Sequence, residues 1–311
     1  MRSAQRKSTH VYSRDPGQKA LTRGLVLMVI AMLIVPGMDV ITKFLSGTIN
    51  GVQVGQARFG FQAAFLLPVI VLMRGPRALM PAIPKLNTAR AVCMAGAVLL
   101  FFTSLKWLPV ADAIAIFFVE PLILTVLSAV FLGEHVGWPR RIAVLAGFLG
   151  ALIVVRPSYE VFGLVALLPL GAALFFAVYL MFTSKLSKSE DAMTMQFFSG
   201  VVGFLVLSAV MVFGEAASIE ILSFAWPTAT EWLWLTTLGA IATVLHLMIV
   251  HAFRAAPASV LAPFNYLEIV SATILGYLVF GDFPDQLKWL GITIIVSSGL
   301  FVFWRESRTG A

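Results

Sequence analysis

The amino-acid sequence predicts an all-α membrane protein with ten transmembrane helices in two inverted five-helix repeats. Three observations carry this prediction. Of the 311 residues, 59% are hydrophobic and only 12% are charged, whereas a soluble domain has about 25% charged residues. The apolar residues form long continuous runs, and rare residues of the first half recur in the same order in the second half. A soluble fold of this length would lack the polar surface to cover so many apolar side chains.

The apolar runs have the length and composition of membrane-spanning helices. About 20 mostly apolar residues cross the hydrocarbon core as a helix, whereas a barrel strand alternates polar and apolar residues over about 10 positions. The runs lie at residues 24–43, 54–73, 89–107, 110–131, 141–155, 161–183, 193–213, 230–253, 257–280 and 287–304. Because the connections between them are short, the sequence predicts a helical bundle without an extramembrane domain.

The basic residues set the expected orientation. The net charge is +7, and most of the 22 Lys and Arg residues, Arg90 counted among them, lie in the N-terminal tail, in the C-terminal tail or in loops after even-numbered runs. The opposite loops contain Lys43, Lys106, Arg156 and Lys288. Loops rich in Lys and Arg stay in the cytoplasm, so we expect an inner-membrane protein with both termini cytoplasmic. The net positive charge is thus explained by membrane topology, and we expect no nucleic-acid partner.

The two halves share rare residue types at one constant separation. It pairs Lys106 with Arg254, Pro109 with Pro257, Glu120 with Glu268, Gly133 with Gly281, and Glu134 with Asp282. A slightly shorter separation pairs Lys43 with Lys185 at the ends of the first and sixth runs. These coincidences indicate an internal duplication.

The duplicated unit contains five helices, so a second copy enters the membrane from the opposite face. We expect a cytoplasmic tail at 1–23, a first repeat at 24–157, a second repeat at 158–304 and a cytoplasmic tail at 305–311. Inverted repeats are typical of secondary transporters, in which two equivalent halves exchange conformations around a site at the midplane of the membrane.

Two acids in the middle of their runs are the main candidates for function. A charge at the centre of a membrane helix costs about 2.5–3.5 kcal/mol on insertion scales. Glu120 and Glu268 occupy equivalent positions of the two repeats, so we expect them near the midplane, across a pseudo-two-fold axis. They would recognise a cationic substrate or relay protons. The alternative is a structural pair, for example of Glu120 with Arg58.

Three other ionisable groups have more than one interpretation. Asp39 belongs to the substrate site or forms a partly solvated ion pair with Lys43, four residues later. Arg58 reaches the interface with its long stem, binds a substrate carboxylate, or locks onto an acid of a neighbouring helix, and the lock is favoured. His246 is a proton-coupling group or, more simply, a hydrogen-bonded packing residue.

Aromatic and amide side chains are expected beside the two central acids. Phe117 lies one turn before Glu120, and Phe264 and Asn265 lie similarly before Glu268. Such residues, with Tyr179 of the sixth run, would form an aromatic wall for a flat or cationic substrate. For any single Phe, a place in the core or against lipid is the stronger interpretation. Tyr179 and Asn265 are better candidates because their polar groups need partners within the membrane.

Prolines are expected to interrupt several runs. A proline removes one backbone hydrogen bond and kinks a helix, which exposes backbone to a cavity or provides a hinge. Two of these prolines lie beside the central acids, and the set comprises Pro36, Pro68, Pro121, Pro169 and Pro263.

The stretch from Phe118 to Glu134, which ends in Gly133-Glu134, and its echo from Glu268 to Asp282 resemble the EamA-type members of the drug/metabolite transporter superfamily. Gln56-Ala57-Arg58-Phe59 is similar to an Arg-Phe position of that family, whereas its first-helix Trp-Gly pair appears here as Pro36-Gly37. The resemblance covers residues 24–304. It implies ten helices around a central cavity and a substrate such as an amino acid, a nucleoside, riboflavin or S-adenosylmethionine.

The leading hypothesis is a secondary transporter for a small cationic or zwitterionic metabolite, working in the bilayer as a monomer or homodimer. A passive channel is the second hypothesis. The sequence has no phosphate-binding loop, so we expect no ATP motor of its own. A membrane-embedded enzyme is disfavoured because the sequence lacks His-Glu-x-x-His and Gly-x-Ser-x-Gly. Cys93 is the sole cysteine, which excludes an intramolecular disulfide and a thiolate metal cluster. We expect no metal and no cofactor.

Overall fold

The computed structural model describes residues 16–45, 47–104, 107–108, 110–155, 163–219, 222–280 and 286–309. These parts of the chain are helical and contain no strand. The first half comprises α1 (Pro16–Leu45), α2 (Gly51–Arg74), α3 (Pro84–Ser104), α4 (Val110–Phe117), α5 (Glu120–Phe131) and α6 (Trp138–Val155). The second half comprises α8 (Leu167–Ser187), α9 (Ala192–Ala216), α10 (Ala229–Ala255), α11 (Ala258–Leu261), α12 (Leu267–Phe280) and α13 (Gln286–Thr309).

Three short 3₁₀ segments join or precede these helices, at Pro76–Leu79 (η1), Gly163–Ala166 (η2) and Ala262–Tyr266 (η4). Within the described residues, seven helical segments are long and apolar enough to cross a membrane, and further apolar helices are shorter. Each predicted run coincides with one helix or with a consecutive series of helical pieces. The predicted fold class, a helical membrane protein with ten helical runs, is confirmed.

Local sequence signals start several of the long helices. The Asn50 side chain accepts a hydrogen bond of 2.8 Å from the Gln53 backbone at the start of α2. Thr228 and Glu231 form a reciprocal capping box at the start of α10. Such caps satisfy backbone donors that would otherwise have no partner in the first helical turn. Helices α2 and α10 therefore begin directly after the polar capping residues Asn50 and Thr228.

Proline has different effects at different places. The fourth run breaks at Phe118–Val119, and α5 restarts at Glu120 with Pro121 in its first turn. The ninth run passes through the 3₁₀ segment η4, which contains Pro263, before α12 begins. These two interruptions are confirmed. They place Glu120 and Glu268 in the first turns of α5 and α12.

The expected interruptions at the other prolines were wrong. Helix α1 continues through Pro36, and α2 continues through Pro68. Pro169 lies in the first turn of α8, where the missing N–H would have no intrahelical partner in any case. Membrane helices tolerate such prolines because neighbouring groups satisfy the freed backbone carbonyls.

The two halves pack through matched helix pairs. Helix α2 packs against its counterpart α9, and α6 packs against its counterpart α13. The contact of α1 with α10 corresponds to that of α8 with α3, and the contact of α1 with α12 corresponds to that of α8 with α5. Exchanging the halves therefore reproduces the principal contacts, as an internal duplication predicts.

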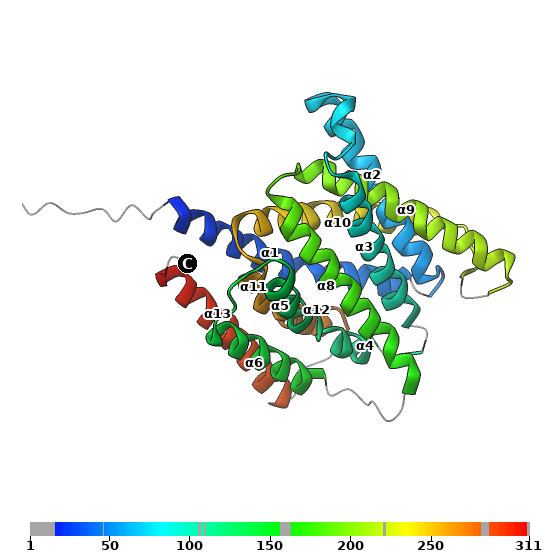
Figure 1. Ribbon diagram of the computed structural model, residues 1–311. Coiled ribbons are helices and arrows are strands. Elements are labelled where there is room, and N and C mark those ends of the chain that lie inside the picture. Colours follow the sequence, from blue (N-terminus) through cyan, green and yellow to red (C-terminus); the bar gives the residue numbers. More distant parts are fainter. Residues whose placement is uncertain are drawn as a thin grey trace, which may run out of the picture.

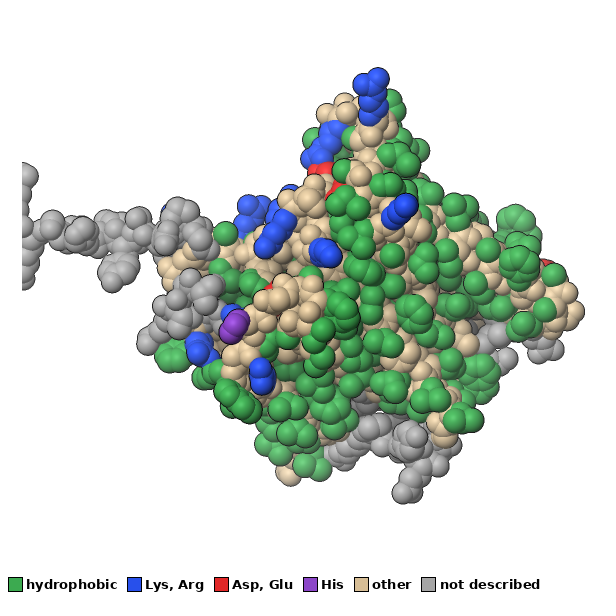
Figure 2. All heavy atoms as spheres, in the orientation of Figure 1, with side chains coloured by type: hydrophobic (Ala, Val, Ile, Leu, Met, Phe, Trp, Pro, Cys, Tyr) green, Lys and Arg blue, Asp and Glu red, His purple; other side chains and the backbone are tan. Residues whose placement is uncertain are grey.

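The surface of the bundle fits a lipid environment. Large apolar side chains are exposed along the described helices, for example Leu72 at 85% and Phe213 at 74%. In Figure 1 the start of α1 and the end of α13 lie at the same end of the bundle. Figure 2 shows Lys and Arg side chains gathered toward that end of the visible face and along its upper edge, while none is seen among the coloured side chains at the opposite end of that face.

Candidate functional site

A central cavity lies between the two halves. It has an empty volume of about 1020 Å³, including its open mouth. Its lining combines three acids, one arginine, one histidine and one asparagine with aromatic and aliphatic side chains from α1, α2, α3, α4, α5, α8, α10, η4 and α12. The two broken runs meet at this cavity, so the breaks bring polar groups from both halves to the same place.

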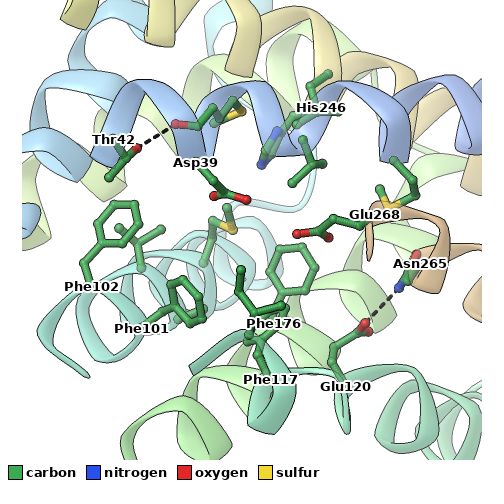
Figure 3. Close-up of a pocket in the computed structure, with 18 of the residues that line it drawn as sticks. Asp39, Thr42, Phe101, Phe102, Phe117, Glu120, Phe176, His246, Asn265 and Glu268 are labelled. Atoms are coloured by element: carbon green, nitrogen blue, oxygen red, sulfur yellow. Dashed lines mark hydrogen bonds between the residues drawn. The ribbon is translucent and has the colours of Figure 1, made fainter. Parts of the chain in front are cut away.

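Three carboxyl groups face the cavity. Asp39 comes from α1, Glu120 from the first turn of α5 and Glu268 from the first turn of α12. Figure 3 shows the Asp39 and Glu268 carboxyl groups directed into the same space, with Glu120 beside them. The structure therefore brings together the two acids that the repeat paired, and it adds Asp39. The side chain of Lys43, the alternative partner of Asp39, lies outside the described residues.

Glu120 and Asn265 form a buried hydrogen bond between the halves. The Asn265 Nδ2 donates to Glu120 Oε2 over 2.8 Å, and the exposed fractions of the two residues are 2% and 5%. The other oxygen of each group, Glu120 Oε1 and Asn265 Oδ1, is buried without a hydrogen-bond partner. A buried acceptor left unpaired costs about 1–3 kcal/mol. Each of these two oxygens is therefore still able to accept a hydrogen bond from an N–H donor.

Arg58 is held by His246. Its Nη2 lies 3.0 Å from His246 Nε2, and both residues are 4% exposed. Arginine only donates hydrogen bonds, so His246 Nε2 accepts in this contact and its ring is neutral. The favoured expectation of a lock between helices is therefore corrected in one respect, because the direct partner is a histidine and not an acid. The burial of Arg58 excludes a side chain that extends to the membrane interface.

The aromatic wall contains only part of the predicted set. Phe117 lines the cavity, with ring centroids 5.3 Å from Phe101 and 5.6 Å from Phe176. Phe264 and Tyr179 are buried but do not line this cavity. The Tyr179 ring lies behind that of Phe176, at 5.5 Å. Of the predicted aromatic residues, Phe117 therefore lines the cavity, and Tyr179 contacts it only through the ring of Phe176.

Arg90 is a buried polar centre that the sequence interpretation missed. The sequence interpretation places it among the loop bases, but α3 begins at Pro84 and encloses Arg90 within the bundle at 0% exposure. Its Nε donates to Thr183 Oγ1 over 2.7 Å, and its Nη1 donates to Ser199 Oγ over 2.7 Å. The helical period carried the signal, since Arg90 shares one face of α3 with Met94 and Ala97, which line the cavity.

The family motif Gly133-Glu134 links the halves at another point. The Glu134 carboxylate accepts hydrogen bonds from the backbone of Ala258 over 3.0 Å and of Ser259 over 2.8 Å. It thereby caps the first turn of α11, which leads into the second broken run. Its repeat counterpart Asp282 lies outside the described residues. Among the residues that the structure describes, no group of His, Cys, Asp and Glu side chains is arranged to hold a metal ion.

A bundle of membrane-spanning helices around a central cavity, with buried charged groups from both halves, has the architecture of a membrane transport protein. The EamA-like transporter family matches the chain twice, over residues 22–156 and 163–304. The chain belongs to this family, and the resemblance inferred from the sequence is confirmed.

Similar proteins agree with this placement. The chain is 30% identical over 278 residues to the S-adenosylmethionine uptake transporter of Rickettsia conorii, covering 87% of this chain and 88% of that protein. It is 30% identical over 287 residues to the riboflavin transporter of Rhizobium johnstonii, covering 92% of each. A crystal structure with 17% identity superposes with a TM-score of 0.76 over 93% of this chain and 98% of the other, which supports the fold.

These relationships confirm a multi-pass membrane transporter for a small metabolite, and they confirm that the chain is not an enzyme.

Proposed function

We propose that this protein is a secondary active transporter that moves a small cationic or zwitterionic metabolite across the inner membrane by alternating access. The observation that carries the proposal is the convergence of Asp39, Glu120 and Glu268 in the lining of the central cavity, where Arg58 is the one Lys or Arg among the described side chains. Three acids against one arginine favour a cation over an anion. The cavity lies between repeats 24–157 and 158–304, which would be the halves that exchange.

S-adenosylmethionine is the first candidate substrate, because its chemistry fits each part of the lining. Its sulfonium and ammonium groups match the acids, and its flat adenine ring matches the wall formed by Phe101, Phe117 and Phe176. Its N–H groups would supply the donors that Glu120 Oε1 and Asn265 Oδ1 lack. The similarity to an S-adenosylmethionine uptake transporter points the same way.

Riboflavin is the second candidate, favoured by the aromatic wall and by the similarity to a riboflavin transporter. It carries no positive charge, so its binding would not need the acids. Transport of riboflavin that survives replacement of Glu120 and Glu268 by glutamine would favour this candidate over a cationic substrate.

The proposed orientation follows from the distribution of basic residues. Loops rich in Lys and Arg are retained in the cytoplasm, which would place both termini there and give the two five-helix repeats opposite orientations. Energy would come from a proton or solute gradient. Alternating access predicts exchange of labelled for unlabelled substrate across the membrane, whereas a passive channel would show no such counter-flow.

Transport in liposomes tests the substrate class. Purified protein would be assayed for uptake and counter-flow of labelled S-adenosylmethionine, riboflavin and neutral amino acids, and compared with Glu120→Gln plus Glu268→Gln. We expect the double substitution to reduce transport of the cation at least about tenfold, a loss of about 1.4 kcal/mol of interaction. Glu215→Gln, at an exposed acid outside the cavity lining, is the matched control. Preferred transport of an anion would refute the proposal.

Cysteine labelling tests the orientation. Met80 follows η1 and is 65% exposed, and Ile219 follows α9 and is 45% exposed. In a Cys93→Ser background, Met80→Cys should react with an impermeant thiol reagent only from the cytoplasmic face and Ile219→Cys only from the opposite face. Labelling of both from the same face would contradict the proposed topology.

Light scattering in detergent would decide between the monomer and the homodimer.

A further inference from the structure

Arg90 is fully buried without a partner of opposite charge. Besides the hydroxyl groups of Thr183 and Ser199, its Nη2 donates to Tyr179 Oη over 3.1 Å and its Nη1 donates to the Met195 carbonyl over 3.2 Å. Its guanidinium also lies 4.7 Å from the centroid of the Tyr179 ring. Within the described part of the chain no acid forms an ion pair with it. Every acceptor around this cation is a neutral group.

Such an arrangement is expensive if its only purpose is to pack helices. Arg90 lies in the second turn of α3, and taking a charge out of water into a protein interior is unfavourable even after the surroundings relax. An apolar residue could join α3 to α8 and α9 without that cost, because replacing buried charges with well-packed apolar residues is often neutral or stabilising. The buried charge of Arg90 therefore points to a role with a negatively charged partner that is absent from this conformation.

The internal repeat allows the surroundings of Arg90 to be compared with those of the equivalent position in the other half. The register that pairs Glu120 with Glu268 also pairs Arg90 with Leu238, and the register that pairs Lys43 with Lys185 also pairs Thr42 with Ser184. Leu238 and Thr42 line the cavity. Arg90 and Ser184 are buried outside its lining, at 0% and 7% exposure. Equivalent positions of the two halves thus have two different environments.

On α1 and α3 the central cavity extends toward the C-terminal end of each helix. Its lining takes Asp39 and Thr42 from the last two turns of α1, and Phe101 and Phe102 from the last turn of α3. In the proposed orientation both helix ends lie on the non-cytoplasmic side. The Arg90 cluster, defined as Arg90 with Tyr179, Thr183 and Ser199, lies toward the opposite ends of α3 and α8 and is buried. Ser184 directly follows Thr183 on α8.

We propose that exchange of the halves opens the Arg90 cluster as the cytoplasm-facing part of the substrate pathway, where Arg90 binds the carboxylate of a zwitterionic substrate. This inference rests on the alternating access proposed above. A carboxylate accepts two parallel hydrogen bonds from a guanidinium and would replace the neutral acceptors that now hold it. The acids of the central cavity would bind the cationic end, and Arg90 would bind the anionic end on the cytoplasmic side.

Thiol labelling with reagents of opposite charge tests the inference without a known substrate. Thr42→Cys and Ser184→Cys would be made separately in a Cys93→Ser background and placed in right-side-out and inside-out vesicles. Each would be treated with impermeant methanethiosulfonates carrying either a trimethylammonium or a sulfonate group, with rates normalised to those for a free thiol. The two positions are equivalent in the repeats, so each serves as the other's matched control.

We expect Thr42→Cys to react only from the non-cytoplasmic face, with a preference for the cationic reagent because of the neighbouring acids. We expect Ser184→Cys to react only from the cytoplasmic face and to prefer the anionic reagent by at least about tenfold, the range that charged clefts produce. Adding Arg90→Gln to Ser184→Cys should abolish that preference, and Arg90→Lys should retain most of it. If the variant with Arg90→Gln does not fold, the charge preference of Ser184→Cys is still compared with that of Ser184→Cys plus Arg90→Lys and with that of Thr42→Cys. These comparisons then test the inference.

A Ser184→Cys variant that stays unreactive from the cytoplasmic face, while Thr42→Cys reacts, would overturn the inference. Reaction without anionic preference would overturn the role of Arg90. The proposed substrate class fails separately, when the cavity acids prove dispensable for transport while the two cysteines keep opposite sidedness and opposite charge preference.

Discussion

Asn265 Nδ2 donates a hydrogen bond of 2.8 Å to Glu120 Oε2 and thereby joins the broken fourth run of the first half to the broken ninth run of the second half. Because both side chains are buried, the bond ties the two halves together at the place where they would have to separate or rotate during transport.

The first prediction concerns the coupling of these two residues. Glu120→Leu and Asn265→Leu should each destabilise the protein by about 1–3 kcal/mol, because each leaves the partner without its buried hydrogen bond. The double variant should lose less stability than the two single variants together, with a coupling energy of about 0.5–3 kcal/mol. Unfolding in mixed micelles would measure the cycle. Strict additivity of the two losses would show that the bond is not a stabilising contact.

The second prediction concerns the Glu134 cap. Glu134→Ala should cost about 0.5–2 kcal/mol, the usual effect of losing an N-terminal cap, because the backbone of Ala258 and Ser259 loses its acceptor. Glu134→Gln keeps one oxygen acceptor and should lose less. Thermal unfolding in detergent would rank the variants. Equal stability of Glu134→Ala and the native protein would contradict the capping role.

The third prediction concerns close packing of α2 against α9. A Cβ added at Gly200 would lie 3.0 Å from the Ala63 nitrogen and 3.0 Å from the Phe59 carbonyl oxygen of α2, and backbone atoms cannot move aside as a flexible side chain can. Gly200→Ala should therefore destabilise by about 1–3 kcal/mol, the typical cost of overpacking.

Gly299→Ala in α13 is the matched control, because a Cβ there meets nothing within 4 Å. Alanine has the higher helix propensity, so this variant should be neutral or slightly stabilising. The same unfolding assay would compare the two. Equal effects at Gly200 and Gly299 would mean that the helices separate easily.

The fourth prediction concerns pH and the ion pair between Arg74 and Asp191 at the start of α9. Partial burial works to raise the pKa of Asp191, but hydrogen bonds from Arg74 and from the Thr194 backbone, with the charge of Arg74, outweigh it and hold the pKa below its usual range. The ionised form therefore stabilises the folded state above the unfolded pKa of about 3.9. This contribution is lost as the pH falls through the lower, folded pKa.

Asp191→Asn keeps a capping oxygen but removes the charge, so its cost at pH 7 should stay below about 1 kcal/mol, as for other partly exposed ion pairs. Thermal unfolding from pH 7 down to about pH 3 should show the native protein and the variant converging at the acidic end. If the difference in stability between the native protein and Asp191→Asn stays unchanged at the lowest pH, its cause is the altered cap geometry and not the lost charge.

The fold class follows from the amino-acid sequence, because continuous apolar runs of this length have one stable arrangement in lipid, a helix that satisfies its own backbone. The pairing of Glu120 with Glu268 also follows from it, because a duplication leaves rare residues at constant separation. The breaks beside Pro121 and Pro263 were predictable for a local reason, the missing N–H of proline, but the same reasoning failed at Pro36 and Pro68, where the helix continues.

Tertiary structure alone decided which polar groups meet. Whether Arg58 contacts an acid or His246, whether Tyr179 lines the cavity or lies behind Phe176, and whether Arg90 belongs to a loop or to the interior all depend on how α2, α3, α8 and α10 are rotated and packed. An apolar run is compatible with many rotations about its axis, because lipid and protein interior are similarly apolar. The contacts between buried polar groups select one of these rotations, and those groups come from helices far apart in the chain.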